Sequence, residues 1–390
     1  MGEVIEGVSK KNANGLYTQD DILACSLGTE LDRKTIFYGL RSTEDSVKSY
    51  RIVNIGNVIY TKSPIKGYPN GIVRTCKIVD GIVPSLYCVY KKKENISIPI
   101  DTRFIQSYLE DKGRLDQYLC PLVNVGARNN VNITDKEFLE GIIKIPTTVE
   151  EQAKIVDVLE KINHLITLHQ RKCEQTKTLK KYMLQKMFPQ DGEKVPQIRF
   201  EGFTEDWEQR KFGEIVEKYE DPVETPTEGY TRLGIRSHAK GTFHSYVEKG
   251  KELETAKMFR VAADKFIVNI TFGWEHAVAI TDENDAGKLV SHRFPQYSFN
   301  AGMEPKFFRY LILDENFKHH LELSSPGGAG RNRVLKLSDM LQYKMNFPSE
   351  AEQKKIAAYF DDLDHLITLH QRKCDELKEV KKFMLQNMFV

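Results

Sequence analysis

Two glycine-containing loops carry side chains whose hydrogen-bonding groups suit the edges of nucleic-acid bases. One loop is Gly126-Ala127-Arg128-Asn129-Asn130, and the other is Gly327-Gly328-Ala329-Gly330-Arg331-Asn332-Arg333. An arginine can donate two hydrogen bonds to guanine, and an asparagine can pair in a similar way with adenine. The alternative is a solvated turn that only orients the strand after it. We take Arg128, Asn129, Arg331, Asn332 and Arg333 as candidate DNA-binding residues.

Other basic residues are weaker candidates for contacts to phosphate groups. Lys91, Lys92 and Lys93 form a run of lysines, although such a run is more often a solvated face. Two further polar segments, 60–62 and 231–238, add Lys62, Arg232 and Arg236. The net charge of the chain is only +2, which is not the strongly basic balance of a stand-alone nucleic-acid binder. Charge alone therefore does not indicate DNA binding.

Two histidine–cysteine pairs share the same spacing, His169 with Cys173 and His370 with Cys374. Two histidines and two cysteines that faced each other could bind zinc tetrahedrally. Polar groups that set the register inside a coiled coil explain the pattern better, so we predict no metal site. The six cysteines include no C-x-x-C pair, which fits a reducing cytoplasm. No apolar run is long enough to indicate a membrane span.

Signatures of catalysis are missing from the sequence. The phosphate-binding pattern G-x-x-x-x-G-K-[ST] does not occur, so we do not expect a motor ATPase. We also find no Asn-Pro-Pro-Tyr/Phe adenine-methylation signature and no nuclease-like pair of carboxylates followed by lysine. We therefore predict no catalytic residues and no cofactor bound by this chain.

The elements that must position these residues follow from an internal repeat. The ten residues His164–Cys173 recur letter for letter at His365–Cys374, and the match extends outward to Glu151-Gln152 and Glu352-Gln353. Neither glycine nor proline occurs in 150–188 or 350–390, where strong helix formers dominate. We expect one long helix in each copy. Repetition at such a long period indicates a duplicated module rather than a solenoid.

Each predicted helix carries one apolar stripe at steps of four and three residues, which is the pattern of a coiled-coil seam. A single stripe cannot bury itself, so we expect the two helices to pack on each other. The exposed triplet Gln170-Arg171-Lys172 is also repeated, as two identical docking sites for two copies of one partner would require. The residues of helix pairing and partner docking are Ile155, Leu159, Ile162, Ile166, His169 and Cys173, with Ile356, Phe360, Leu363, Ile367, His370 and Cys374.

The remaining sequence divides into two dissimilar modules of mixed α and β character. Strand-like runs at 51–55, 58–61, 72–78 and 86–90 precede a predicted helix at 104–119 in the first module. In the second, strands are expected at 265–272 and 277–281 and a helix at 306–321. We predict five segments: a first module at 1–149, a helix at 150–188, a linker at 189–196, a second module at 197–348 and a helix at 349–390.

The two modules begin differently. Gly2-Glu3-Val4-Ile5-Glu6 matches Gly213-Glu214-Ile215-Val216-Glu217, so the stretch Ile198–Phe212 has no counterpart in the first module. That stretch opens the second module with Arg199-Phe200, Gly202-Phe203 and Trp207. We therefore expect the first module to be short at its amino-terminal side.

The duplicated plan resembles the specificity subunit of type I restriction–modification systems. The resemblance rests on the variable modules, the glycine–arginine loops, the proline before Glu-Gln, the helix ending in Met-Leu-Gln-x-Met-Phe and the R-F-x-G-F-x-x-x-W opening. It implies an α+β chain with two target-recognition domains separated by two conserved helices, which form an antiparallel coiled coil with pseudo-twofold symmetry. It also implies a non-catalytic subunit that reads the two halves of a split site in double-stranded DNA.

The resemblance further implies partners. Two methyltransferase subunits would dock on the helices and methylate adenine with S-adenosylmethionine, and motor-nuclease subunits that use ATP and Mg would complete the restriction enzyme. The alternative is a purely structural coiled-coil adaptor without its own sequence readout. Such an adaptor would explain the helices but not two dissimilar modules of this size.

Overall fold

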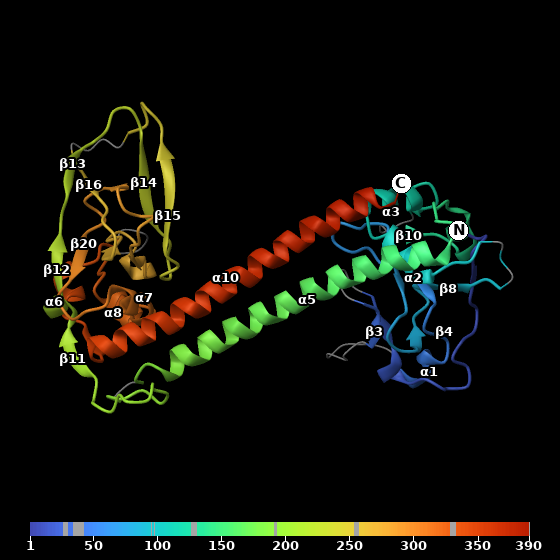
Figure 1. Ribbon diagram of the computed structural model, residues 1–390, viewed down its shortest axis with the longest axis horizontal. Coiled ribbons are helices and arrows are strands. Elements are labelled where there is room, and N and C mark those ends of the chain that lie inside the picture. Colours follow the sequence, from blue (N-terminus) through green and yellow to red (C-terminus); the bar gives the residue numbers. More distant parts are fainter. Residues whose placement is uncertain are drawn as a thin grey trace. The chain divides into compact units, whose positions relative to one another are not determined.

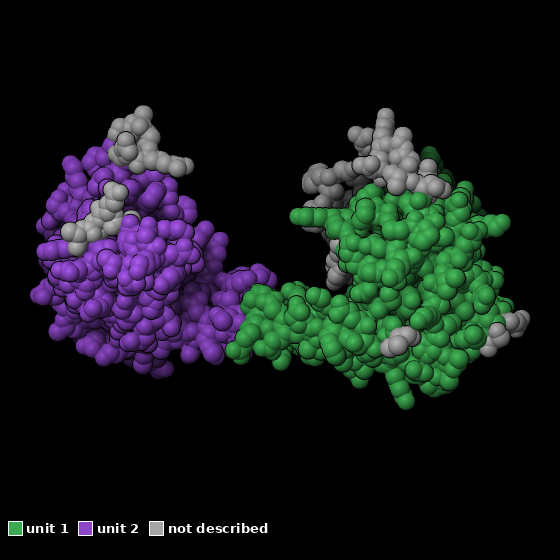
Figure 2. All heavy atoms as spheres, turned by 90° about the horizontal axis from the view of Figure 1, so that it is seen from above, with its two compact units in different colours: residues 1–171, 371–390 green, residues 172–370 purple. Residues whose placement is uncertain are grey.

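The computed structural model describes the chain except for residues 26–29, 34–42, 95, 97, 126–130, 191–192, 253–256, 328–332 and 390. The chain forms two compact units, coloured separately in Figure 2. Unit 1 consists of residues 1–171 and 371–390, and unit 2 of residues 172–370. Each unit therefore contains one module, the amino-terminal part of one long helix and the carboxyl-terminal part of the other.

The long helices are α5 (Val149–Lys186) and α10 (Glu350–Asn387), each of 38 residues (Figure 1). The start of α5 is capped by the hydroxyl of Thr148, which accepts a hydrogen bond from the backbone N–H of Glu151 at 3.4 Å. A side-chain oxygen before a helix satisfies one of the free N–H groups of its first turn. The two predicted helices are confirmed.

Within each unit the two helices run antiparallel. In unit 1, Ile155, Val156 and Leu159 near the start of α5 share an apolar cluster with Leu385 near the end of α10. In unit 2, Lys180 near the end of α5 pairs with Asp364 of α10 at 2.5 Å. Most predicted seam residues are buried, and only His169, Ile367 and His370 are half-buried. Val156 and Ala357, outside the predicted stripe, are buried as well.

The module of unit 1 is built on a four-stranded antiparallel sheet with the order β1-β8-β5-β6. Tyr60 and Tyr90 on this sheet stack on Phe138 of α4, at ring distances of 4.9 and 4.8 Å. The main elements are β1 (Ile5–Gly7), β5 (Val58–Thr61), β6 (Ile72–Thr75), β8 (Tyr87–Lys92), α2 (Thr102–Tyr108), α3 (Lys112–Leu119) and α4 (Asp135–Glu140). Smaller elements are η1 (Gln19–Asp21), α1 (Glu44–Val47) and the strand pairs β2 (Leu23–Ala24) with β3 (Asp32–Arg33), β4 (Arg51–Val53) with β7 (Gly81–Val83), and β9 (Asn124–Val125) with β10 (Val131–Asn132).

Unit 2 contains an equivalent four-stranded sheet, β12-β20-β17-β18. Its strands are β12 (Val216–Tyr219), β17 (Lys265–Val268), β18 (Val278–Ile280) and β20 (Gln296–Phe299). A further sheet with the order β13-β16-β19-β14-β15 comprises β13 (Pro222–Glu224), β14 (Tyr230–Ile235), β15 (Thr242–Val247), β16 (Lys257–Arg260) and β19 (Leu289–Val290). The remaining elements are β11 (Glu208–Lys211), β21 (Lys344–Phe347), α6 (Phe212–Ile215), η3 (Gly273–Glu275), α7 (Pro305–Leu311), α8 (Glu315–Leu323) and α9 (Leu337–Met340).

The mixed α and β fold class is confirmed, but two helix predictions are wrong in the same way. The stretches 104–119 and 306–321 each form two short helices rather than one. Asp111 and Asp314 cause the breaks, because each side chain accepts a hydrogen bond from the backbone of the next helix. An aspartate that caps a new helix ends the helix before it.

Candidate nucleic-acid interface and helix frame

A buried glutamine near the start of each long helix holds the module of its own unit. The amide nitrogen of Gln152 donates to the carbonyls of Pro99 and Pro146, at 3.0 and 2.9 Å. Its oxygen accepts from the backbone N–H of Asp101 at 2.8 Å. Because Asp101 caps α2, this glutamine joins three segments of the unit.

Gln353 repeats the arrangement in unit 2. Its amide nitrogen donates to the carbonyls of Gly302 and Pro348, at 3.3 and 2.8 Å. Its oxygen accepts from the backbone N–H of Glu304 at 2.9 Å, and Glu304 caps α7. Both glutamine side chains are fully buried. The two modules differ in sequence, but each is attached to the start of its long helix by an equivalent glutamine with equivalent partners.

Equivalent cysteines tie the middle of one helix to the other. The thiol of Cys173 donates to the carbonyl of Ile367 at 3.8 Å within unit 2. The thiol of Cys374 donates to the carbonyl of Ile166 at 3.6 Å within unit 1. Over the described ranges, no three His, Cys, Asp or Glu side chains gather in a way that could hold a metal ion. Each thiol thus contacts the backbone of the other helix at a matching position.

The exposed side of the helices carries a repeated apolar surface that our sequence reasoning missed. Leu165 and Leu168 are 41% and 37% exposed in unit 1, and their counterparts Leu366 and Leu369 are 41% and 38% exposed in unit 2. The neighbouring triplets 170–172 and 371–373 are exposed too. The predicted seam residues pack within the helix pair, whereas these leucines are among the apolar side chains of the two helices that remain exposed. Their exact repetition within 164–173 was the signal.

In unit 1, two of the candidate lysines hold the edge of the sheet. Lys91 pairs with Glu6 across the strand pair β8 and β1 at 3.0 Å, and Lys93 donates to the carbonyl of Gly2 at 2.5 Å. Lys92 is exposed, and Lys62 is half-buried at the end of β5. Arg128 and Asn129 lie outside the described residues.

In unit 2, Arg232 and Arg236 belong to the hairpin of β14 and β15. Arg232 is half-buried and lies opposite Ser245. Arg236 is exposed, donates to the carbonyl of Thr242 and lies 5.3 Å from the ring of Phe243. Phe243 is itself exposed. The turn of the hairpin thus presents a cation beside an aromatic ring.

The structure brings this hairpin turn next to Arg333. The backbone N–H groups of His238 and Ala239 donate to the carbonyls of Glu275 and His276, each at 2.8 Å, which fixes the turn against η3. Trp274 of η3 lies 5.5 Å below the guanidinium of Arg333. We name residues 236–243, 272–275 and 333 the hairpin surface. Arg331 and Asn332 lie outside the described residues.

The end of the hairpin next to its turn is fixed by a buried carboxylate. Asp285 is almost fully buried and accepts hydrogen bonds from the hydroxyl of Thr242 at 2.9 Å and from the ring of His244 at 2.7 Å. A buried carboxylate that is paired in this way orders the side chains around it. The amino-terminal end of β15 is therefore held while its aromatic side chains remain exposed.

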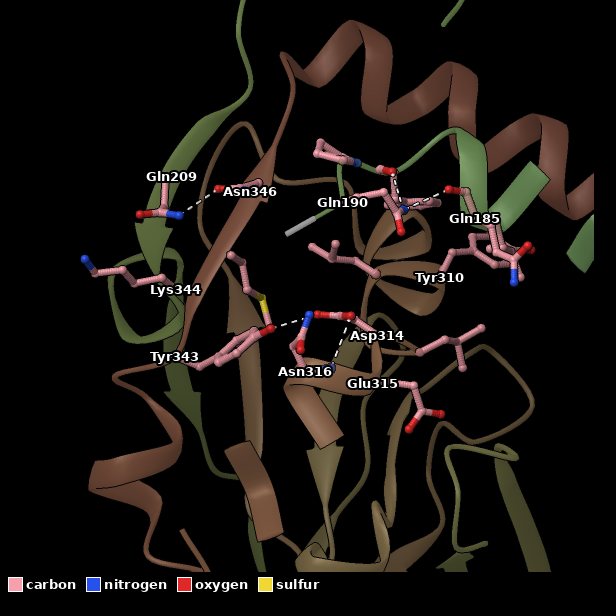
Figure 3. A pocket seen from close by; sticks show the side chains of 16 residues that line it. Gln185, Gln190, Gln209, Tyr310, Asp314, Glu315, Asn316, Tyr343, Lys344 and Asn346 are labelled. Atoms are coloured by element: carbon pink, nitrogen blue, oxygen red, sulfur yellow. Dashed lines mark hydrogen bonds between the residues drawn. The ribbon is translucent and has the colours of Figure 1, made fainter. Parts of the chain in front are cut away.

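A cavity of about 800 Å³ lies elsewhere in unit 2, between the end of α5, the start of α8 and β21 (Figure 3). Its lining mixes amides and carboxylates with apolar and aromatic side chains, and the hydroxyl of Tyr343 donates to Asp314 at 2.7 Å. None of the candidate DNA-binding residues that the structure describes lines it. No helix in the described parts of the chain is both long and apolar enough to cross a membrane.

Comparison with known proteins agrees with this architecture. Residues 204–379 match the family model described as the type I restriction modification DNA specificity domain. The type I restriction enzyme MjaVIII specificity subunit of Methanocaldococcus jannaschii is 24% identical over 266 residues, which cover 64% of this chain and 61% of that protein. The chain therefore spans less than two thirds of the length of this curated relative.

Solved structures were compared as well. The crystal structure of a type I restriction–modification S subunit from M. genitalium aligns with a TM-score of 0.57 and 12% identity, covering 100% of this chain and 94% of that one. The HsdS subunit from Thermoanaerobacter tengcongensis aligns with a TM-score of 0.45 and 15% identity, covering 100% and 95%. The first likeness shows a shared fold.

Proposed function

Since the chain carries a type I restriction modification DNA specificity domain over residues 204–379, we propose that its two modules read the two halves of a bipartite site in double-stranded DNA. The observation that carries the proposal is the repeated glutamine anchor, Gln152 in unit 1 and Gln353 in unit 2. It attaches modules of different sequence to one frame by the same contacts. A structural adaptor has no need of two exchangeable modules.

In this proposal the hairpin surface is the part of unit 2 that contacts DNA. A two-stranded β-ribbon fits the major groove, where arginine can pair with guanine. Arg236 and Arg333 supply cations, and the exposed Phe243 supplies an apolar contact. In unit 1 the corresponding candidates are Lys62, Lys91, Lys92, Lys93, Arg128 and Asn129.

The chain works without catalysis of its own. Two methyltransferase subunits bind the repeated leucine surfaces, and they supply adenine methylation with S-adenosylmethionine. Restriction subunits that use ATP and Mg²⁺ join through them. Such a complex acts on cytoplasmic DNA. The repetition of Leu165, Leu168, Leu366 and Leu369 with nearly equal exposure supports two equal docking sites.

DNA reading is tested with the reconstituted complex. Arg236→Ala and Arg333→Ala are each expected to weaken DNA binding, by about 1–3 kcal/mol where the arginine reads a base. Lys354→Ala is the matched control, because Lys354 is an exposed cation of unit 2 that pairs with Glu350 far from the hairpin in sequence. Methylation-aware sequencing with residues 197–348 exchanged for those of a relative should alter one half of the motif only. Unchanged affinity for both arginine variants would place the reading surface elsewhere.

Docking is tested by the mass of the complex. The unmodified chain should hold two copies of the methyltransferase subunit, and Leu168→Glu or Leu369→Glu should each remove one. The double variant should bind neither copy while the chain stays folded, because both side chains are exposed. A fully active particle with one partner copy would contradict the duplicated docking sites.

A further inference from the structure

A second cavity, of about 790 Å³, lies within unit 1, where the end of α10 meets the loop between α2 and α3. Pockets that bind small molecules typically have volumes of about 300–1,000 Å³. Part of its lining is apolar: Ile72, Leu109, Leu115 and Leu385 are buried there, and Tyr68 is half-buried. The cavity therefore has the size of a small-molecule site and offers an apolar surface to a ligand.

The rest of the lining carries an excess of positive charge. Its two carboxylates are Glu110 and Asp111. Its six cations are Arg74, Lys112, Arg114, Lys378, Lys381 and Lys382. Lys112 and Lys378 also pair with Asp116 and Asp375 beside the lining, at 2.5 and 3.4 Å. Six cations against four carboxylates leave a net charge of +2 in this one region, which equals the net charge of the whole chain.

Arg114 is a half-buried cation of this lining that has no carboxylate partner in the described chain. Its guanidinium donates to the carbonyls of Tyr108 and Leu385, at 2.7 and 2.6 Å, and lies 4.5 Å from the ring of Phe389. Its Nη2 atom is buried and makes no hydrogen bond there. Burial lowers the pKa of Arg114, against the charge of Asp111. Because carbonyls and rings do not neutralise a guanidinium, its charge acts on whatever occupies the cavity.

Three lysines of α10 add further positive charge along one side of the cavity. Lys378, Lys381 and Lys382 are spaced by three and four residues and therefore share a face of the helix. Lys381 donates to Glu110 at 2.7 Å, which ties this face to the α2–α3 loop. Lys382 is exposed and forms no ion pair within the described chain. The pairing of an exposed lysine such as Lys378 with a neighbouring carboxylate contributes little energy, so it can turn toward an anion at small cost.

The equivalent cavity of unit 2 has a different charge. It is the cavity of Figure 3, and residues 184–185 of α5 line it as residues 385–386 of α10 line the cavity of unit 1. The charged side chains of its described lining are Asp314, Glu315 and Lys344. The repeated helices thus contribute to both cavities, and the positive charge is a feature of unit 1 and not of the frame in general.

We propose that the cavity of unit 1 binds a nucleoside triphosphate. Lysines bind phosphate groups as compact point charges, and three linked phosphates gather several negative charges as closely as this lining gathers cations. The base lies on the apolar side chains and on Tyr68, because bases stack on aromatic rings. The backbone of DNA instead spaces single phosphates along each strand. The proposal adds a ligand and no catalytic role, and it does not depend on DNA recognition.

The test uses the full chain and fluorescently labelled ATP. Fluorescence anisotropy should show one saturable site per chain, and inorganic triphosphate should displace the probe at least about tenfold more effectively than adenosine does. Hydrogen exchange should slow at residues 109–115. Lys382→Glu should weaken binding at least about tenfold, which corresponds to about 1.4 kcal/mol.

The internal repeat supplies the matched control. Lys181→Glu makes the same change at the equivalent position of α5, which is exposed and does not line the cavity of unit 2, so the affinity should stay the same. Neither variant puts folding at risk, because both lysines are exposed. The proposal is overturned by the lack of saturable binding, by equal losses from the two variants or by equal displacement with adenosine. It is also overturned if duplex DNA displaces the probe as well as triphosphate does at equal phosphate concentration, because the cavity would then be a contact to the DNA backbone.

Discussion

Unit 1 and unit 2 attach their modules to the long helices by the same contacts, but the two modules carry different additional elements. The glutamine anchors, the cysteine–carbonyl contacts and the order of the central sheet are the same in both. The five-stranded sheet with its exposed hairpin and the segment 198–211 occur in unit 2. The repeated residues thus build the frame, and the unrepeated residues form the surfaces that can recognise different ligands.

The two glutamates near the starts of the long helices are equivalent in sequence but have different surroundings. Glu352 is buried and paired because Arg199 lies beside it, while the equivalent Glu151 is exposed. The Glu-Gln sequence is repeated in both helices, yet only its glutamine makes the same contacts twice. Repetition of a residue therefore does not by itself establish repetition of its environment.

The largest expected effect is a loss of stability in unit 2 when Glu352 is replaced, compared with a small effect when Glu151 is replaced. Glu352→Ala leaves the guanidinium of Arg199 without its carboxylate, and breaking such a buried pair costs about 3–5 kcal/mol. Glu151→Ala changes an exposed position and should alter stability by less than about 0.5 kcal/mol. Both tryptophans of the protein, Trp207 and Trp274, lie in unit 2. Urea unfolding followed by tryptophan fluorescence therefore reports on that unit.

For unit 1 the measurement is hydrogen exchange at α2. Equal losses from the two glutamate variants would mean that the carboxylates have equivalent surroundings, contrary to the structure. Glu352→Gln is the matched control. It keeps the shape and one hydrogen-bond acceptor but removes the charge, so it should fall between Glu352→Ala and the unmodified chain.

The second prediction concerns the glutamine anchor, which makes the same contacts in both units. Gln152→Ala and Gln353→Ala each remove three hydrogen bonds and leave buried backbone groups without partners. Each unsatisfied group costs about 1–3 kcal/mol, and water that enters the space offsets part of the loss, so a total of about 2–3 kcal/mol is expected in each unit. Hydrogen exchange resolved by unit is the measurement. A clearly smaller loss from one variant would contradict a shared anchor.

Much of the frame was predictable because its signals are local or repeated. The two long helices followed from uninterrupted helix formers, and nine of the twelve predicted seam residues, from Ile155 to Cys374, are buried. The breaks at Asp111 and Asp314 were missed, although an aspartate before a polar turn is a recognised cap. The glutamine anchor was within the repeat, but its partners are distant in sequence.

The candidate site was less predictable. Arg236, Trp274 and Arg333 come together through backbone hydrogen bonds between the hairpin turn and η3. The parallel pairing of β14 with β19 likewise joins segments that are far apart in the chain. Composition and periodicity describe neighbours along the sequence and contain little information about such contacts. The exposed leucines lie within the repeated sequence, but the coiled-coil prediction places the apolar residues of the helices in the buried interface between them.

The third and smallest effect concerns pH, because burial lowers the pKa of one histidine of unit 2, His276, while residues 1–149 contain no histidine. His276 is buried, its Nε2–H donates to the carbonyl of Ile312 at 2.8 Å, and its φ is +59°. Burial lowers the pKa of His276 below 6.5, and the charge of Lys318 lowers it further, against the Ile312 hydrogen bond and the charge of Glu315. The folded state therefore resists protonation of this ring.

The sign of the pH effect follows from the lowered pKa. Above pH 6.5 the ring is neutral in both the folded and the unfolded state, so protonation of His276 does not reduce the free energy of unfolding. As the pH falls below 6.5 the unfolded chain takes up the proton first, so the free energy of unfolding of unit 2 should decrease until the lowered folded pKa is passed. Urea unfolding followed by tryptophan fluorescence between pH 7.5 and 5 is the measurement. His276→Asn is the matched control, because asparagine tolerates the left-handed backbone without titrating. If this variant retained the full decrease, the loss would arise from other groups of unit 2 and not from His276.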